Sequence, residues 1–290
     1  DNTNRVMLSS FVTHISSAMK NYIVRDRIHD SLERILTQGL LFIMSADYTQ
    51  FEQRKQDHIA LAIMPSNQAL EHNGLDGIAL MHEALPDLDF NKIDISSSRF
   101  GQKVLKPFLV SSMTAGHQAG VGINQTLAEA CHEMGWAMGV GSQRRELTDP
   151  AAGLEWQEIR KHYPKLTLYS NLGAAQLITS PLEEVLRLAE SLWANAFIIH
   201  CNPLQECIQP EGTPQFKGIW KALEALVRAT PLPIIVKETG CGFTEPTLKR
   251  LNDIGIAAVD VSGLGGTHWG RSDGHRDTEP PMPQQASETF

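Results

Sequence analysis

The chain has 290 residues and a net charge of -8 at pH 7, with 42% hydrophobic and 20% charged residues. This length and composition allow one sizeable core, and no apolar run approaches the ~18 residues of a membrane span, which predicts a soluble protein without a membrane partner. The acidic balance, with a pI near 5.8, disfavours nucleic acid as a partner but allows a local basic site for a phosphorylated small molecule.

The first 43 residues differ from the rest of the chain. Their apolar side chains fall at helical spacing, which predicts one amphipathic helix through Leu8, Phe11, Val12, Ile15 and Met19. Met44 resembles a natural start, so we expect residues 1–43 to be an extension, either an expression remnant or a translated upstream segment. An interaction helix is the competing interpretation. Residues 44–106 follow as a segment that precedes the main fold and carries the basic pair Arg54-Lys55.

Six short apolar runs then recur at nearly even spacing, and each is short enough for a buried parallel strand. They cover residues 108–110, 136–138, 167–169, 196–199, 234–236 and 257–259. Helical signals lie between them. Asn124 is predicted to cap a helix that stops at Gly135, and Ser180-Pro181 with Glu183 has the pattern of a capping box.

Strand followed by helix, six times, predicts an α/β fold. Residues 107–290 suit about six units of ~31 residues each, so one interpretation is a (β/α)8 TIM barrel that is truncated after the sixth βα unit. The alternative is a doubly wound open sheet, which periodicity alone leaves open. No Gly-x-Gly-x-x-Gly follows the first strand, and this weakens a dinucleotide-binding interpretation.

The four cysteines, Cys131, Cys201, Cys207 and Cys241, form no C-x-x-C pair. Without a secretory leader they are typical of reduced thiols in the cytoplasm, and they argue against a zinc site.

Polar residues follow every predicted strand, where an α/β barrel carries its chemistry. In chain order they are Ser111, Ser112, Met113 and Thr114; Ser142, Gln143 and Arg144; Ser170 and Asn171; His200, Asn202, Gln205 and Glu206; Lys237 and Glu238; and Ser262, Gly265, Gly266 and Thr267. Each alone is explained by loop hydrogen bonding, but six in succession at equivalent positions indicate a site.

Lys237 gives the sharpest signal because its ammonium follows a buried strand and needs an anionic partner or a depressed pKa there. An ion pair with Glu238 is disfavoured, since neighbours on a strand face opposite ways. An anionic ligand is therefore favoured, and a reduced flavin, which is negative near its N1, is one such ligand.

Three other features each have two interpretations. Arg54-Lys55 is a solvated surface pair or, with Arg144, a diphosphate clamp. Glu206 is a helix N-terminal carboxylate or a magnesium ligand beside a diphosphate. Gly265-Gly266-Thr267 is a tight loop or a phosphate-binding turn.

Taken together, the motifs resemble those of type 2 isopentenyl diphosphate isomerase, in the family's order, from about Asp47 to Arg276. The matching segments are Arg54-Lys55-x-x-His58, Ser112-Met113-Thr114, Gly139-Val140-Gly141-Ser142-Gln143-Arg144, Ser170-Asn171-Leu172-Gly173, His200-x-Asn202-Pro203-Leu204-Gln205-Glu206, Val236-Lys237-Glu238 and Gly263-x-Gly265-Gly266-Thr267.

The resemblance implies an FMN-dependent (β/α)8 barrel that interconverts isopentenyl and dimethylallyl diphosphate with reduced FMN and Mg²⁺, primed by NADPH, in a tetramer or larger homo-oligomer. It assigns FMN contacts to Ser112, Met113, Thr114, Ser142, Asn171, Lys237, Ser262 and Thr267. It assigns substrate binding to Arg54, Lys55, Ser142, Gln143, Arg144, His200, Asn202 and Gln205. Catalysis falls to Gln205, Glu206 and His200, and Glu206 is the metal ligand.

The sequence also departs from the family pattern at Ala115, Thr213 and Asp273, where the family commonly has glycine, an acid and glutamate. The last two barrel units, which supply backbone donors to the flavin phosphate, are absent, so we expect weak flavin binding. Two alternatives follow: an inactive fragment or subunit partner, and an FMN-dependent 2-hydroxy acid oxidase that would use Arg271, His275 and Arg276.

Overall fold

The structure is a computed structural model, and it describes residues 60–69, 74–113, 118–209 and 212–274. The predicted helix in residues 1–43 lies outside these residues, as does the Arg54-Lys55 pair. Among the described residues, no helix combines the length and the apolar character needed to cross a membrane.

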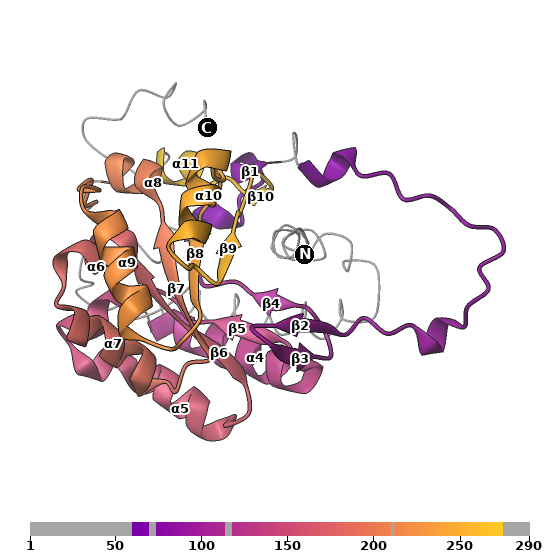
Figure 1. The fold of residues 1–290 in the computed structure, drawn as a ribbon, viewed down its shortest axis with the longest axis horizontal. Helices are drawn as coiled ribbons and strands as arrows, with labels where there is room; N and C mark the ends of the chain where they lie inside the picture. The colour runs from indigo at the N-terminus through magenta and orange to yellow at the C-terminus, as the bar shows by residue number, and fades with distance from the viewer. Residues whose placement is uncertain (1–59, 70–73, 114–117, 210–211, 275–290) are drawn as a thin grey trace.

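A six-stranded parallel sheet forms the centre of the fold (Figure 1). Its strands are β4 (Leu109–Val110), β5 (Ala137–Gly139), β6 (Thr167–Gly173), β7 (Ala196–Cys201), β8 (Ile234–Glu238) and β9 (Ala258–Asp260). Each falls on one of the six predicted apolar runs, so all six strand predictions are confirmed.

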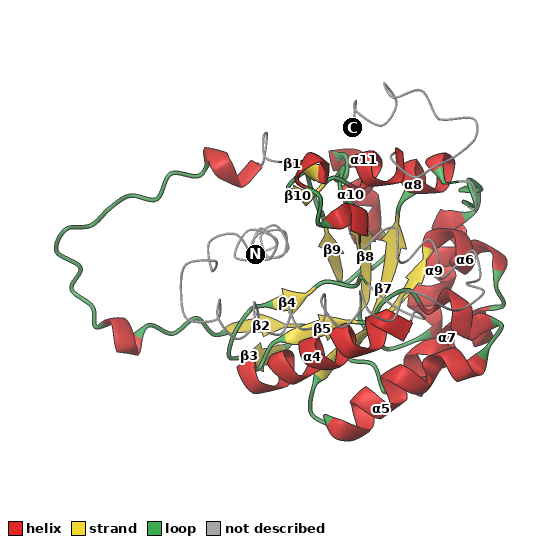
Figure 2. Cartoon of the chain, turned by 180° about the vertical axis from the view of Figure 1, so that it is seen from behind, coloured by secondary structure: helices red, strands yellow, loops and turns green. Residues whose placement is uncertain are grey.

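The strand order decides between the two predicted architectures. The strands lie in the order β4-β5-β6-β7-β8-β9, each hydrogen-bonded to its neighbours in sequence. A doubly wound sheet reverses its order at a switch point, whereas a barrel adds strands in sequence. The sheet also curls, so the fold is an α/β half-barrel and the open-sheet alternative is excluded (Figures 1 and 2).

Helices connect the strands, and α4, α5, α7 and α9 cover the outer face of the curled sheet (Figures 1 and 2). The α-helices are α4 (Gln118–Met134), α5 (Leu154–His162), α6 (Ala174–Thr179), α7 (Leu182–Ser191), α8 (Pro203–Ile208), α9 (Ile219–Ala229), α10 (Glu245–Asp253) and α11 (Trp269–Gly274). Short 3-10 turns are η3 (Pro65–Asn67), η4 (Gly74–Gly77), η5 (Phe90–Lys92), η6 (Gln143–Leu147) and η7 (Pro150–Gly153).

The two faces of the sheet bury separate apolar clusters. On β7, Phe197 and Ile199 face the helices and join the larger cluster, whereas Ala196 and Ile198 face the inside of the curl. This alternation follows from the two-residue period of a strand. Burial on both faces explains why the strands appear in the sequence as continuous apolar runs.

Two predicted helix starts were wrong. Helix α4 begins at Gln118, so Asn124 lies inside it, where its side-chain nitrogen donates to Glu155 across 2.6 Å instead of capping. The N-cap residue of helix α7 is Pro181, one position after the predicted Ser180, and no side chain caps the helix. The predicted end of α4 before Gly135 is confirmed, since Gly135 takes a positive φ of 67°.

A hairpin that the sequence did not predict lies across the sheet from the helices. Strands β2 (Ser97–Arg99) and β3 (Gln102–Val104) pair antiparallel around Phe100 and Gly101, both at positive φ. The strained conformation of Phe100 is offset by packing, because its ring meets that of Tyr169 edge-on at 6.2 Å in the inner cluster. The hairpin thus covers part of the inner face.

A second antiparallel pair joins distant parts of the chain. Strand β1 (Gln68–Ala69) pairs with β10 (Gly266–Thr267), and the backbone N–H of His268 donates to Asn67 across 2.7 Å. This pair fastens the segment before the sheet to the glycine-rich loop after β9, beside α11 and α8 (Figure 1).

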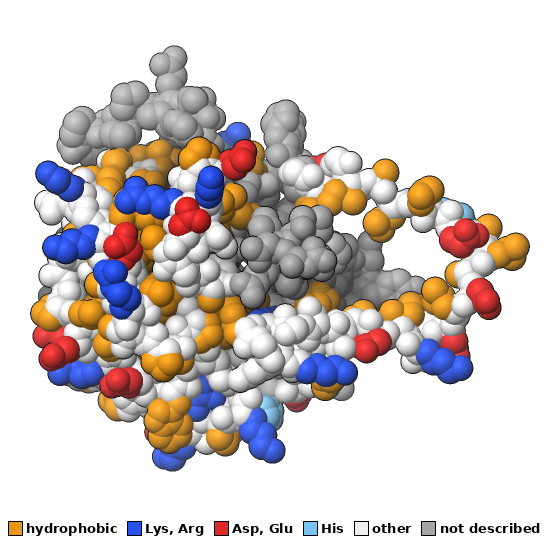
Figure 3. All heavy atoms as spheres, in the orientation of Figure 1, with side chains coloured by type: hydrophobic (Ala, Val, Ile, Leu, Met, Phe, Trp, Pro, Cys, Tyr) orange, Lys and Arg blue, Asp and Glu red, His pale blue; other side chains and the backbone are white. Residues whose placement is uncertain are grey.

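The segment between η4 and β2 runs away from the sheet in an extended loop (Figures 1 and 3). Its large apolar side chains are exposed: Ile78, Leu80, Met81, Leu85, Leu88, Phe90, Ile93 and Ile95.

Candidate functional site

The carboxyl ends of neighbouring strands bring polar side chains into one layer. In the register of the sheet, His200 of β7 lies opposite Lys237 of β8, and Lys237 lies opposite Asp260 of β9. Adjacent strands are about 4.8 Å apart, so these residues from three strands lie side by side. Asp260 was not singled out in the sequence, because its role depends on a pairing that spacing does not reveal.

His200 is held by the neighbouring strand. Its Nδ1 lies 3.0 Å from Oδ1 of Asn171, which is buried on β6. The backbone of β6 also approaches closely, since a Cβ on Gly173 would lie 3.1 Å from Nε2 of His200 and 2.3 Å from Oε1 of Gln176. Glycine at position 173 therefore leaves the space that the imidazole occupies.

Glu206 lies at the turn from β7 into α8 and is almost fully buried. Its Oε1 accepts from Nδ2 of Asn202, the N-cap residue, at 3.2 Å, and its Oε2 accepts from the backbone N–H of Thr213 at 2.5 Å. Each oxygen keeps a second lone pair. The carboxylate is fixed at the helix N-terminus, where the macrodipole stabilises it, and it retains capacity for a cation.

Gln205 contacts a buried carboxylate from a distant part of the chain. Its Nε2 donates to Oδ2 of Asp273 on α11 across 2.7 Å, and Gln209 donates to Oδ1 of the same residue across 2.8 Å. Asp273 is only 2% exposed. The sequence analysis noted Asp273 only as a departure from the family pattern, and the 68 residues that separate it from Gln205 gave no signal of this contact.

Lys237 and Glu238 do not pair through their side chains. The carboxylate of Glu238 accepts from the backbone N–H groups of Gly240, Cys241 and Gly242 at 2.6, 2.5 and 2.9 Å. Nζ of Lys237 donates to the backbone carbonyl of Glu238 at 2.8 Å. Within the described residues this is its one hydrogen bond, which leaves two of its three donors for a ligand.

Ser112 follows β4 with a hydroxyl that is buried and has no hydrogen-bond partner among the described residues. A Cβ on Gly139 of β5 would lie 2.3 Å from this oxygen, so the glycine leaves room for it. Buried hydroxyls are normally bonded, and an unpaired one marks a place for a missing polar partner. Met113 beside it is exposed, and Thr114 lies outside the described residues.

The segment after β5 alternates in exposure. Ser142 and Arg144 are half-buried, whereas Gln143 between them is 0% exposed. Arg144 forms no ion pair or hydrogen bond with another described residue, so its guanidinium is available. The side-chain amide of Gln143 is saturated by contacts within the fold, and its assignment to substrate binding stays a prediction.

The loop after β9 closes the site on another side. Ser262 takes a φ of 53°, and its N–H donates to Oδ1 of Asp260 at 3.0 Å. Gly263 and Gly266 also have positive φ, a conformation that glycine adopts without strain. A small hollow lies between this loop and α8, lined by Gln205, Glu238, Gly263, Thr267 and Trp269.

Acid–base chemistry by the thiol of Cys201 is disfavoured. All four cysteines are free, and burial raises the pKa of Cys201, beside His200, to about 12. Within the described chain, no three His, Cys, Asp or Glu side chains gather closely enough to hold a metal ion by themselves.

Several predicted residues cannot be placed. Arg54, Lys55, His275 and Arg276 lie outside the described residues, while Arg271 is half-buried on α11.

Comparison with known proteins gives a consistent result. Isopentenyl-diphosphate delta-isomerase of Legionella pneumophila strain Lens is 60% identical over 247 residues, which cover 85% of this chain and 72% of that protein. The enzyme of that name from Bdellovibrio bacteriovorus is 51% identical over 251 residues, with the same coverage. The one from Synechocystis is 39% identical over 229 residues, covering 78% of this chain and 65% of that protein.

No protein-family model matches the chain. Among solved structures, a mandelate oxidase variant superimposes with a TM-score of 0.42 and 17% identity, covering 61% of this chain and 55% of that one.

Proposed function

The chain belongs to the isopentenyl-diphosphate delta-isomerase family, and from that premise we propose that it converts isopentenyl diphosphate to dimethylallyl diphosphate. The reaction moves a double bond by adding a proton to one carbon and removing a proton from another. It involves no net oxidation or reduction.

The observation that carries the proposal is the layer of His200 and Lys237 on adjoining strands, next to the α8 turn that holds Gln205 and Glu206. An imidazole, an ammonium, an amide and a carboxylate at one end of a parallel sheet form the set that an anionic substrate and its metal require. Each of these side chains is fixed by a named contact, so the site is preorganised.

We propose reduced FMN as the cofactor, held by Ser112, Met113, Thr114, Ser142, Asn171, Lys237, Ser262 and Thr267. Two observations on the described residues support the fit: the hydroxyl of Ser112, next to Gly139, has no partner among them, and two donors of Lys237 are unused by them. When bound, reduced FMN supplies an acid–base group for an alkene that ordinary side chains protonate poorly. That this half-barrel belongs to a (β/α)8 TIM barrel of the FMN-dependent type stays a prediction.

We further propose that the substrate diphosphate is bound by Arg54, Lys55, Ser142, Arg144, His200, Asn202 and Gln205. Arg144 supports this assignment because its charge is not used within the described fold. Mg²⁺ would be held by Glu206 together with diphosphate oxygens, since this metal favours one or two carboxylates plus substrate phosphates. Gln205, Glu206 and His200 are then the proposed catalytic residues.

The chemistry requires a site that excludes water, because a cation-like state on carbon would be trapped by it. The apolar inner cluster, which Phe100 and Tyr169 help to fill, supports such a site below the polar layer. NADPH as the reductant, assembly into a homo-oligomer and a cytoplasmic location stay predictions.

Turnover measured by mass spectrometry tests the function. The purified chain is incubated with isopentenyl diphosphate, and reduced FMN or Mg²⁺ is omitted in turn. We expect product only with both present, and a large loss in Lys237→Ala but not in Lys221→Ala, which removes an exposed lysine on α9. If the complete mixture yields no product, the proposed function fails, and an inactive fragment or subunit partner becomes the better interpretation.

A further inference from the structure

Gln143 lies between two proposed ligand-binding residues but contacts only the protein. Its Nε2 donates to Oε2 of Glu146 and to the backbone carbonyl of Leu188, each at 3.1 Å. Its Oε1 accepts from the hydroxyl of Ser170 and, at 3.1 Å, from the backbone N–H of Asn171. A primary amide has two N–H donors and two lone pairs, so all of its hydrogen-bonding capacity is used.

Two of these contacts are with backbone groups, the carbonyl of Leu188 and the N–H of Asn171. Leu188 is in the last turn of α7, where helix carbonyls lack backbone partners within the helix, and its carbonyl accepts from Gln143 as well as from the hydroxyl of Ser191, at 2.9 Å. Strand β5 ends at Gly139, opposite Tyr169, so the N–H of Asn171 two residues on has no strand partner on that side. The side chain of Gln143 thus links the end of β5 to β6 and α7 through one buried group.

We propose that Gln143 is a positioning residue, whose buried amide fixes the backbone from Ser142 to Arg144 so that these two side chains face the ligands at the strand ends. This inference rests on the proposed function, which gives Ser142 and Arg144 their ligands. Because the side chain of Gln143 is buried, the residues on either side of it are held near the surface of the site.

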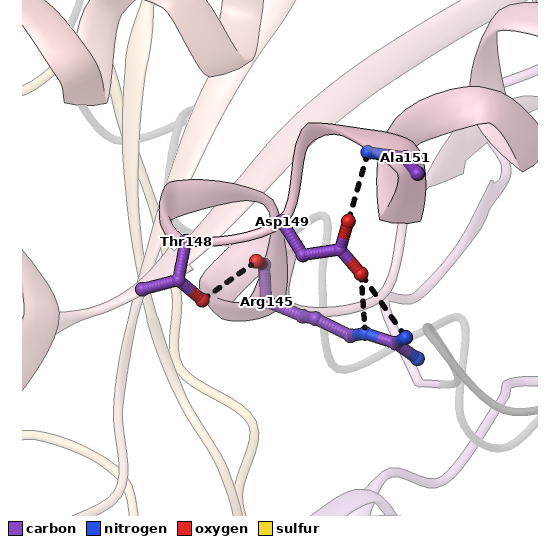
Figure 4. A network of polar contacts seen from close by, with 4 residues as sticks. All are labelled: Arg145, Thr148, Asp149 and Ala151. Carbon is purple, nitrogen blue, oxygen red and sulfur yellow. Dashed lines mark hydrogen bonds and ion pairs between the residues drawn. The ribbon is translucent and has the colours of Figure 1, made fainter.

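The segment that follows is fixed by contacts of its own. Arg145 donates from Nε to Asp149 at 3.2 Å and pairs with it through its terminal nitrogen at 3.1 Å, while the other oxygen of Asp149 accepts from the N–H of Ala151 (Figure 4). Thr148 adds a bond to the carbonyl of Arg145. The charge of Arg145 is therefore used locally, and Arg144 is the arginine left for the ligand.

The test compares Gln143→Met, which keeps the length of the side chain but removes its hydrogen bonds, with Arg160→Met. Arg160 is also buried, and it donates to the backbone carbonyls of Pro164, Leu166, Leu192 and Trp193 near the starts of β6 and β7, at the opposite end of the strands. Both variants lose buried hydrogen bonds, but only one of them adjoins the proposed site. Ser170→Ala, which removes one partner of Gln143, is the milder variant.

Two readouts are used. In kinetics, we expect Gln143→Met to raise KM for isopentenyl diphosphate by about tenfold to a hundredfold with a smaller change in kcat, since displacement of a binding group by ~1 Å has an effect of this size. In hydrogen exchange of the folded chain, which requires no activity, we expect faster exchange at the amides of residues 142–144 and 171 in Gln143→Met but not in Arg160→Met.

The double variant Gln143→Met/Ser170→Ala should show the same KM and exchange rates as Gln143→Met, because the hydroxyl of Ser170 acts through the side-chain amide of Gln143. If Gln143→Met fails to fold, Ser170→Ala should still show the same pattern at lower amplitude. Unchanged exchange at residues 142–144 in both would overturn the proposal, as would an equal KM effect in Arg160→Met. A wild-type chain without turnover but with the expected exchange pattern would overturn the proposed function and leave the positioning role in place.

Discussion

Gln205 donates from Nε2 to the buried carboxylate of Asp273 across 2.7 Å, a contact that joins the turn after β7 to α11. The other oxygen of Asp273 is taken by Gln209. The amide of Gln205 is therefore oriented with its nitrogen toward α11, which leaves its oxygen as the atom free to accept a hydrogen bond from a ligand.

Replacing Asp273 by Asn should release Gln205. The new amide presents a donor to one of the two glutamines, and we expect kcat/KM to fall by about tenfold to a hundredfold, because a charge-assisted bond contributes about 1.5–3 kcal/mol. Steady-state kinetics measures this loss, with circular dichroism to show that the fold persists. Full activity in folded Asp273→Asn would mean that the contact does not orient Gln205.

Glu146 should make stability depend on pH. Burial, more than any other cause, raises the pKa of its carboxyl from an ordinary 4.5 to about 7, so the folded chain binds this proton more tightly than the unfolded chain does. The stability that proton binding at Glu146 gives to the folded chain is therefore present in full below pH 4.5 and is lost as the pH rises through about 7.

Glu146→Gln has no ionisable group at this position, so this pH-dependent part of the stability is removed. Relative to the wild type, the free energy of unfolding of this variant should increase by about 3 kcal/mol between pH 4.5 and pH 8. Urea unfolding at both pH values measures the difference, with Glu129→Gln on the exposed face of α4 as the control. A constant difference between variant and wild type across this range would contradict the prediction.

A methyl group at position 139 should disturb the proposed flavin site. The Cβ of Gly139→Ala would meet Oγ of Ser112 at 2.3 Å and Cδ1 of Ile198 at 3.2 Å, so the serine has to move. We expect weaker retention of FMN, scored by the visible absorption band after desalting. Gly122→Ala is the matched control, because nothing lies near its added methyl, and helix propensity should stabilise it by about 0.5–1 kcal/mol. Equal FMN retention in both variants would argue against Ser112 as a flavin contact.

Removing the charge of Glu206 should raise the Mg²⁺ requirement. Glu206→Gln keeps an oxygen for Asn202 but offers a weaker metal ligand, so we expect a rise of about tenfold or more in the Mg²⁺ concentration for half-maximal activity. Glu190→Gln, an exposed change on α7, should leave that concentration unchanged. The same Mg²⁺ dependence in Glu206→Gln and the wild type would rule out Glu206 as a ligand.

The sequence was sufficient to predict the six parallel strands, because burial on both faces gives each a continuous apolar run. It did not predict β1, β2, β3 or β10, which are only two or three residues long. Strands β1 and β10 depend on pairing with each other across the chain, and the hairpin of β2 and β3 is anchored by the contact of Phe100 with Tyr169. The cap predicted at Asn124 failed for a related reason, since a contact with Glu155 on α5 uses that side chain.

In the candidate site, too, local features could be predicted from the sequence, whereas contacts with distant residues could not. Lys237 was singled out because charge after a buried strand is visible in the sequence, and its expected lack of an ion pair with Glu238 is confirmed. The interpretation of Gln143 as a substrate contact stays a prediction, and its hydrogen bond to Leu188, 45 residues later in α7, could not be read from the sequence. Asp273 was missed because its partners come from α8.

The most direct test of the central claim is NMR of the chain incubated with isopentenyl diphosphate, reduced FMN and Mg²⁺ in deuterated water. Proton addition and removal predict dimethylallyl diphosphate that carries deuterium from the solvent, with no stoichiometric consumption of reduced flavin. Dimethylallyl diphosphate without deuterium, or no product from a chain that has bound both flavin and substrate, would contradict the account.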